Sequence, residues 1–307
     1  MSEAFFPGFE VRAIPTPEAT IRVRVGGSGP PLLLLHGHPQ THAMWHAVAP
    51  RLARDHTVVC ADLRGYGGSS KPATTADHEP YSKRAMARDM VAVMERLGFA
   101  RFAMAGHDRG GRVAYRLALD HRERVERLAV LDIVPTYEMW RRVDKEFGLV
   151  DYHWFFLAQP APFPERLIAA APDEFYFRRD PSRFHPEALA DYRRAVHDPA
   201  TIHAMCEDYR AGAGYDDEAD RADMEAGRSI ECPLHVLWAG RDELGRWFDV
   251  LEVWRRWCAG QVSGRPLDCG HFLAEEAPAE TAGELHGFLS SGAAPSSGGS
   301  GPAGLRS

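Results

Sequence analysis

The stretch that decides the fold is FAMAGHDRGGR, residues 102–112. It begins as a short apolar run, continues through a turn from Gly106 to Gly110, and passes into the helical apolar spacing of residues 113–118. The pattern predicts a strand, a sharp turn and a helix. In such a turn the central residue, here Asp108, stands at the top of a sheet, and the glycines allow two backbones to pass closely.

The identity of Asp108 restricts the chemistry of this turn. A carboxylate that attacks an ester carbonyl would form an anhydride, whereas one that displaces a leaving group from saturated carbon forms an ester that water can cleave. A serine making the same displacement would form an inert ether. The sequence therefore predicts substitution at an sp3 carbon, followed by hydrolysis of the protein's own aspartyl ester.

The sequence on both sides of this turn predicts an α/β fold. Alternating strands and helices in this order give a mostly parallel central sheet that is covered on both faces. An antiparallel hairpin is indicated at residues 10–25 by alternating apolar and polar residues. Further strands are predicted at 32–35, 58–61, in the apolar run before Gly106, at 128–134 and at 234–238, with a last strand and turn at 266–272 and helices at 81–97 and 252–258.

Residues 136–228 interrupt this alternation. They are helical in pattern, aromatic and punctuated by prolines, and they contain no strand-like run. We expect a helical cap over the carboxyl ends of the strands, where ligands bind in open α/β sheets. The core is then formed by residues 1–135 and 229–289, and the Ser/Gly-rich tail, residues 290–307, is expected to be disordered.

Composition excludes several classes of function. A net charge of -7 argues against nucleic acid or an anionic membrane as the main partner. No apolar segment approaches the ~20 residues of a membrane span, and residues 1–7 do not resemble a signal peptide, so we expect a cytoplasmic protein. The five cysteines are scattered, which favours reduced thiols over a disulfide or metal framework, and we expect no metal and no cofactor.

Three residues follow the chain order nucleophile, acid, histidine that accompanies such a turn. They are Asp108, Asp132 and His271. The predicted task of His271 is to take a proton from the water that attacks the ester on Asp108. Asp242 is a second candidate for the acid, because it also ends a strand and could hold the second nitrogen of the histidine. Local sequence alone does not separate the two acids.

Arg109 and Arg112 flank the nucleophile. Arg112 lies one helical turn beyond Asp108, so both guanidinium groups can point toward the opening of the site at Asp108. Two such groups would keep the nucleophile ionised and would bind a substrate carboxylate. An anionic substrate is therefore predicted, with a salt bridge to the cap as the alternative role for either arginine.

Five runs of the sequence resemble the fluoroacetate (haloacetate) dehalogenases of the α/β-hydrolase superfamily. The resemblance extends from about residue 5 to residue 289, and the combination of an Asp-Arg-Gly-x-Arg turn with a His-Trp pair in the cap is its most specific part. The runs are HGHPQTH at 36–42, GHDRGGR at 106–112, DYHW at 151–154, CEDYRAG at 206–212 and GHF at 270–272.

The resemblance implies a division of labour. Asp108 would attack the α-carbon and expel halide, Arg109 and Arg112 would hold the substrate carboxylate, and Asp132, preferred here over Asp242, would act with His271 to activate water. The resemblance assigns hydrogen bonds to the departing halide to His153, Trp154 and Tyr209. Donors fixed in a dry pocket suit fluoride, because its charge appears only in the transition state. A homodimer is expected by analogy.

Two features depart from that family. The His36-Gly37 turn is shared with α/β-hydrolases, in which a backbone N–H from this turn helps to form the oxyanion hole, but His38 stands where relatives usually have an apolar aromatic residue. In addition, no tryptophan occurs between Trp154 and Trp238, where relatives place one that narrows the pocket. We therefore expect tolerance of larger 2-halo acids.

Two other functions fit part of the pattern. An epoxide hydrolase would share the aspartate and histidine, but it opens its ring with cap tyrosines and has little use for paired arginines beside the nucleophile. A non-catalytic ligand receptor could also use this fold, although here nucleophile, acid and base are all present.

Overall fold

The computed structural model describes residues 5–178 and 180–291. One eight-stranded sheet forms its centre, with the order β1-β2-β4-β3-β5-β6-β7-β8. The strands β1 and β2 form an antiparallel hairpin, β2 also runs antiparallel to β4, and every other neighbouring pair is parallel. The predicted α/β-hydrolase fold with a mostly parallel sheet is confirmed. The strands are β1 Phe9–Pro15, β2 Thr20–Gly27, β3 Pro31–Leu35, β4 Thr57–Ala61, β5 Phe102–His107, β6 Val125–Leu131, β7 Leu234–Ala239 and β8 Val262–Leu267.

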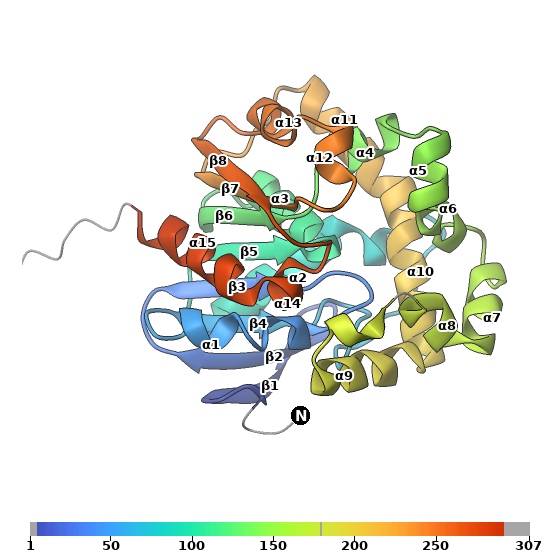
Figure 1. Ribbon diagram of the computed structural model, residues 1–307, viewed down its shortest axis with the longest axis horizontal. Coiled ribbons are helices and arrows are strands. Elements are labelled where there is room, and N and C mark those ends of the chain that lie inside the picture. The colour runs from blue at the N-terminus through green and yellow to red at the C-terminus, as the bar shows by residue number, and fades with distance from the viewer. Residues whose placement is uncertain (1–4, 179, 292–307) are drawn as a thin grey trace, which may run out of the picture.

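Helices cover both faces of the sheet (Figure 1). On one face α1 contacts α15, and on the other α2 contacts α3, the helix that follows the Asp108 turn. The middle strands β3 and β5 are almost fully buried, which explains their continuous apolar sequence. These helices are α1 Ala49–Leu52, α2 Lys83–Arg96, α3 Arg109–Asp120, α12 Leu244–Trp247, α13 Val250–Trp257, α14 Leu273–Glu276 and α15 Pro278–Ser290, with the 3-10 turns η2 His42–Trp45 and η3 Glu79–Tyr81.

The chain between β6 and β7 is helical, and Figure 1 shows these helices beside the sheet as a separate layer. This is the segment that we propose as the cap, residues 136–228. Its elements are α4 Thr136–Arg141, α5 Lys145–Val150, α6 His153–Leu157, α7 Phe163–Ala170, α8 Pro172–Phe177, η4 Pro181–Arg183, α9 Pro186–Val196, α10 Pro199–Ala213 and α11 Tyr215–Glu225. No helix in the described ranges is both long and apolar enough to span a membrane.

Several predicted boundaries are wrong, and each has a local cause. The predicted strand at 128–134 included two apolar residues too many. The strand β6 ends at Leu131, and residues 133–134 are buried in the loop that follows it. The strand β8 begins at Val262, earlier than predicted. It is an edge strand with few apolar residues, so the apolar pattern did not reveal its start. The helix α2 begins after Ser82, whose side chain caps it.

The predicted start of the disordered tail at residue 290 is also wrong, because α15 continues through Ser290. The rest of the predicted tail, residues 292–307, lies outside the described residues.

Candidate active site

Asp108 lies at the sharp turn between β5 and α3. Its φ of 45° is in the left-handed region, which is strained for a residue with a side chain. A Cβ at Gly106 would clash with the backbone at Gly110, and a Cβ at Gly110 would clash with the His36 carbonyl. Only glycine fits at these two positions, so the sequence pattern of the turn follows directly from its close packing.

The carboxylate of Asp108 is held ionised in a buried setting. Its Oδ2 accepts a hydrogen bond from the backbone N–H of His38 at 2.9 Å. Burial alone would raise the pKa of Asp108, but the positive charges of His271 and Arg109 hold this pKa well below its usual range. An ionised carboxylate with one fixed donor on Oδ2 leaves Oδ1 as the oxygen available for attack.

His271 pairs with Asp132 rather than with Asp242. The His271 Nδ1 lies 2.6 Å from Asp132 Oδ2, and Asp132 Oδ1 accepts the backbone N–H of Ala239 at 2.8 Å. Asp242 lies close by, and its Oδ1 accepts the backbone N–H of Glu243 at 3.1 Å. The structure therefore brings together Asp108, Asp132 and His271 in the order that the sequence suggests, with Asp132 in direct contact.

The charge of His271 depends on its acidic neighbours. Burial alone would lower its pKa, but the hydrogen bond and charge of Asp132, with the charges of Asp108 and Asp242, raise the pKa of His271 to about 9. Removing one of those negative charges would make this imidazole easier to deprotonate.

Arg109 is fully buried and paired with the cap. Its Nε lies 3.1 Å from Asp208 Oδ2, and its Nη2 lies 2.6 Å from Asp208 Oδ1. Burial alone would lower the pKa of Arg109, but the Asp208 carboxylate raises this pKa well above its ordinary value. Its Nη1 is buried and has no hydrogen-bond partner among the described residues. Both roles considered from the sequence, cap salt bridge and anion binding, are therefore compatible with Arg109.

Arg112 is equally buried but is held by uncharged groups. Its Nη1 donates to the Val134 carbonyl at 3.0 Å and to the Thr136 hydroxyl at 3.2 Å. Burial and the charge of Arg109 lower the pKa of Arg112. Its Nε is buried and finds no hydrogen-bond acceptor within the part of the chain that the structure describes. Arg112 also lines the cavity that Asp108 borders.

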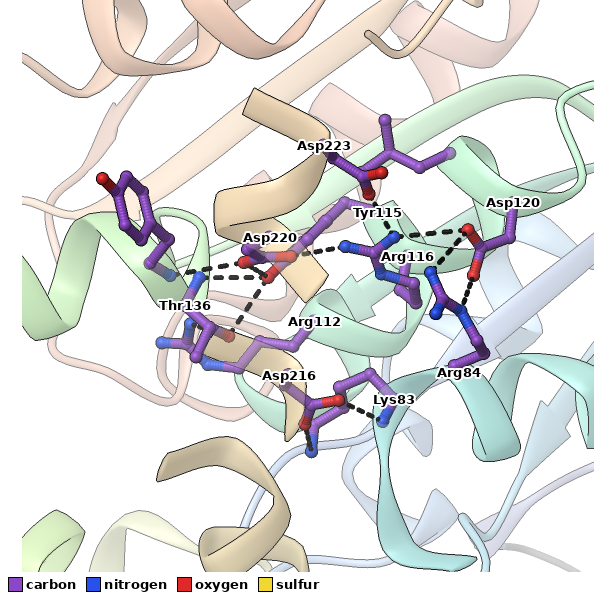
Figure 2. A network of polar contacts seen from close by, with 12 residues as sticks. Lys83, Arg84, Arg112, Tyr115, Arg116, Asp120, Thr136, Asp216, Asp220 and Asp223 are labelled. Carbon is purple, nitrogen blue, oxygen red and sulfur yellow. Dashed lines mark hydrogen bonds and ion pairs between the residues drawn. The ribbon is translucent and has the colours of Figure 1, made fainter. Parts of the chain in front are cut away.

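A polar network behind Arg112 fixes Thr136, as Figure 2 shows. The Tyr115 hydroxyl lies 3.1 Å from the Thr136 hydroxyl and 2.6 Å from Asp220 Oδ2, and it accepts the Thr136 backbone N–H at 3.0 Å. Asp220 in turn binds Arg116 Nη2 at 2.6 Å. The network joins α3 of the core to α4 and α11 and so ties the position of Arg112 to the proposed cap.

The cavity above Asp108 has a volume of about 290 Å³. His153 and Trp154 from α6 and Tyr209 from α10 line it opposite the core, and His38 lines it beside the nucleophile. The rings of His153 and Tyr209 are 5.6 Å apart, and those of Trp154 and Tyr209 are 6.0 Å apart. The structure thus gathers the three residues of the predicted halide site around one part of the cavity.

Sequence reasoning missed the partners of the two arginines. Asp208 directly precedes Tyr209, so it lay within a noted run, but nothing in the sequence joins it to Arg109. Thr136 gave no signal at all. Asp151, which lines the cavity, was also missed as a titrating group, and burial raises its pKa to about 6.

Within the described residues, one group of three potential metal ligands occurs, formed by Asp132, Asp242 and His271, with ligand atoms within 4.8 Å of one another. A metal needs the neutral imidazole of the histidine. The pKa of His271, about 9, instead favours imidazolium that is hydrogen-bonded to Asp132, with the charge of Asp242 nearby. These residues fit a proton-transfer site better than a metal centre.

Comparison with known proteins places the chain in a family. The family model of the alpha/beta hydrolase fold matches residues 30–278. A fluoroacetate dehalogenase from Burkholderia sp is 48% identical over 292 residues, which cover 93% of this chain and 95% of that protein. A soluble epoxide hydrolase from Corynebacterium sp. (strain C12) is 34% identical over 262 residues, which cover 82% of this chain and 87% of that protein.

Among solved structures, one from Nostoc sp PCC 7120 described as an alpha/beta hydrolase is 52% identical, with a TM-score of 0.90, and covers 92% of this chain and 98% of that chain. The resemblance to the fluoroacetate dehalogenases is therefore confirmed. The chain belongs to the alpha/beta hydrolase family.

Proposed function

We propose that this chain is a hydrolytic dehalogenase of short 2-halo carboxylic acids, which converts fluoroacetate to glycolate and fluoride through an aspartyl ester. The observation that carries the proposal is the pair of buried guanidinium groups of Arg109 and Arg112, each with an unpartnered N–H, beside the ionised Asp108. The Burkholderia relative named a fluoroacetate dehalogenase supports the same activity.

Substrate binding uses the two arginines. Arg112, which lines the cavity, would bind one oxygen of the substrate carboxylate. Arg109 does not line the cavity, but its Nη1 has no hydrogen-bond partner among the described residues, and we assign the second oxygen to it. This holds the anionic end of the acid away from the Asp108 charge and turns the α-carbon toward it. Orientation of this kind converts a bimolecular displacement into an effectively intramolecular one.

In the first chemical step Asp108 Oδ1 attacks the α-carbon. The new C–O bond forms while the C–F bond breaks, and the electron pair leaves with fluoride. His153, Trp154 and Tyr209 donate hydrogen bonds to that charge as it develops. Burial lowers the pKa of His153 to about 3 and raises the pKa of Tyr209 well above its ordinary value, so both are neutral groups that can donate at pH 7.

In the second step water cleaves the ester. Neutral His271 takes a proton from the water, which attacks the ester carbonyl carbon of Asp108, and the His38 N–H stabilises the resulting oxyanion. When this intermediate collapses, the bond between Asp108 Cγ and the glycolate oxygen breaks, the Asp108 carboxylate is restored, and the leaving oxygen takes the proton from His271. Because ester formation removes the charge of Asp108, it removes one of the interactions that raise the pKa of His271. The first step thereby prepares the base for the second, and Asp132 holds the imidazole in the required orientation.

The test measures fluoride release from fluoroacetate with a fluoride electrode. Wild-type protein should release fluoride from fluoroacetate, and Asp108→Asn should be slower by roughly 10⁴-fold or more. A parallel assay of styrene oxide hydrolysis tests the epoxide hydrolase alternative. Hydrolysis of the epoxide without release of any halide from 2-halo acids would reject the proposal in favour of that alternative, and no reaction with either substrate would favour a non-catalytic receptor.

The epoxide hydrolase alternative is not favoured, because the epoxide hydrolase from Corynebacterium is the more distant relative.

The size of the cavity supports a wider range of 2-halo acids, since a two-carbon acid occupies little of about 290 Å³. A sharply higher KM for larger acids than for fluoroacetate would contradict this range. A cytoplasmic homodimer without metal or cofactor completes the proposal, supported by the family resemblance.

A further inference from the structure

We propose that His38 is a fourth hydrogen-bond donor to the departing halide and that it favours fluoride over heavier halides. The inference rests on the proposed function and adds a residue to the three halide donors that the family resemblance implies.

The ring of His38 borders the same part of the cavity as the other donors. Its backbone N–H is hydrogen-bonded to Asp108 Oδ2 at 2.9 Å, which fixes the residue beside the nucleophile. The ring centroid lies 5.2 Å from that of Tyr209 and 6.3 Å from that of His153, whose plane differs by only 6°. All three rings line the cavity in which the halide would depart.

One polar atom of the His38 ring, Nδ1, has no hydrogen-bond partner among the described residues. In His36, two residues earlier, Nδ1 donates to the Gly37 carbonyl at 2.8 Å and Nε2 accepts the Leu63 N–H at 3.0 Å, so that ring is fully satisfied. The Nδ1 of His38 is buried without a hydrogen-bond partner among the described residues. An unsatisfied buried polar atom costs roughly 1–3 kcal/mol, so a ligand that satisfies the ring explains its presence.

The chemistry of His38 suits a halide leaving group. Burial lowers its pKa to about 4, so at pH 7 it is a neutral imidazole with a single N–H. A neutral ring neither competes with Arg109 and Arg112 for the substrate carboxylate nor transfers a proton to Asp108. Because fluoride is small and its negative charge is concentrated, a donor in the transition state should help fluoride more than chloride.

The test compares fluoroacetate with chloroacetate in three variants. His38→Phe should lower the single-turnover rate for fluoroacetate by roughly 10²-fold, the loss typical of one oxyanion donor, and the rate for chloroacetate by a clearly smaller factor. His38→Asn places an amide near the position of Nδ1, and His38→Gln near that of Nε2. We expect one of them to restore part of the fluoride preference, which would identify the donating nitrogen.

A matched control is His56→Phe, which removes another buried imidazole with an unpartnered Nδ1, but one that does not line the cavity. Its ratio of fluoroacetate to chloroacetate rates should equal that of the wild type. Equal losses for both substrates in His38→Phe would reduce His38 to a packing residue and would overturn the proposal.

A second readout separates this inference from the proposed function. Calorimetric titration with sodium fluoride measures anion binding without turnover, and His38→Phe should weaken that binding at least tenfold, whereas His56→Phe should not change it. If the wild type releases no halide but this loss of fluoride affinity is seen, the proposed function fails and the anion site at His38 stands. Unchanged fluoride affinity in His38→Phe would overturn the inference whatever reaction the protein catalyses.

Discussion

Two arginines three residues apart on α3 have opposite surroundings. Arg109 is paired with the carboxylate of Asp208, whereas Arg112 donates to the uncharged oxygens of Val134 and Thr136. Both side chains are buried, with exposed fractions of 0% and 2%. The pKa of Arg109 is raised by its carboxylate partner, while burial and the charge of Arg109 lower the pKa of Arg112.

The different surroundings of Arg109 and Arg112 indicate different roles, although the sequence predicts the same role for both arginines. A buried charge is costly unless an opposite charge balances it. Asp208 balances Arg109 within the protein, so this pair joins the core to the proposed cap, and Arg109, unlike Arg112, is not among the residues that line the cavity. Arg112 has no carboxylate hydrogen-bonded to it among the described residues, and Asp108 and Asp151 oppose its charge from the cavity, which suits it to bind a substrate carboxylate.

The largest expected effect is on stability, from Asp208→Asn. The substitution leaves Arg109 buried without its carboxylate, so the free energy of unfolding should fall by about 3–5 kcal/mol, measured by urea denaturation. The control is Glu231→Gln, which breaks an exposed pair with Arg122 and should cost no more than about 1 kcal/mol. Equal losses in the two variants would contradict the structural role of Asp208.

Arg112→Met should affect binding rather than folding. Loss of the guanidinium that faces the substrate carboxylate should lower kcat/KM for fluoroacetate by roughly 10²-fold, or about 2.7 kcal/mol, mainly through a higher KM. Arg112→Lys keeps the charge but loses the planar guanidinium fork, so its kcat/KM should lie between those of the wild type and Arg112→Met. An unchanged KM in Arg112→Met would show that Arg109 alone binds the acid.

Thr136→Val tests whether the neutral support of Arg112 matters. The variant removes one hydrogen-bond acceptor of Arg112 and one partner of Tyr115, while keeping the size of the side chain. KM should rise by about 2- to 10-fold, corresponding to 0.5–1.5 kcal/mol, and Thr136→Ser should recover most of this loss. A fall in kcat at constant KM would argue that Thr136 acts on the chemistry instead.

The smallest effect is expected from Asp242→Asn, because the charge of Asp242 raises the pKa of His271 less than Asp132 and Asp108 do. In the wild type the pKa of His271 is raised to about 9, so its protonation stabilises the fold fully below pH 6.5, and this contribution is lost as pH rises through about 9. The variant should move the His271 titration to lower pH, measured by NMR on histidine-labelled protein. A titration that does not move would exclude any influence of Asp242 on the base.

Local pattern was enough to predict much of this molecule. The Gly106 to Gly110 turn identifies Asp108 as its centre, because only glycine allows the close backbone approach on either side. The switch from alternating strands and helices to a purely helical segment likewise identifies the insertion between β6 and β7. Both features depend on residues that are neighbours in the sequence.

Contacts between distant parts of the chain could not be predicted. Arg109 and Asp208 are 99 residues apart, and no local rule joins them. Asp132 and Asp242 each follow a strand, so the choice between them depends on how the His271 loop lies against the sheet, which sequence spacing does not encode. For the same reason the helical spacing of Arg109 and Arg112 predicted that both face the same site, but not that their partners differ or that only Arg112 of the two lines the cavity.

The central claim is that a carboxylate oxygen of Asp108 bonds to the substrate carbon. A single turnover of fluoroacetate in water enriched in oxygen-18, with protein in excess, tests this most directly. We predict that the label enters the Asp108 side chain and that the first glycolate carries unlabelled oxygen from that carboxylate, measured by mass spectrometry of the peptide and the product. Labelled glycolate in the first turnover, with unlabelled protein, would mean that water attacks carbon directly and would contradict the account.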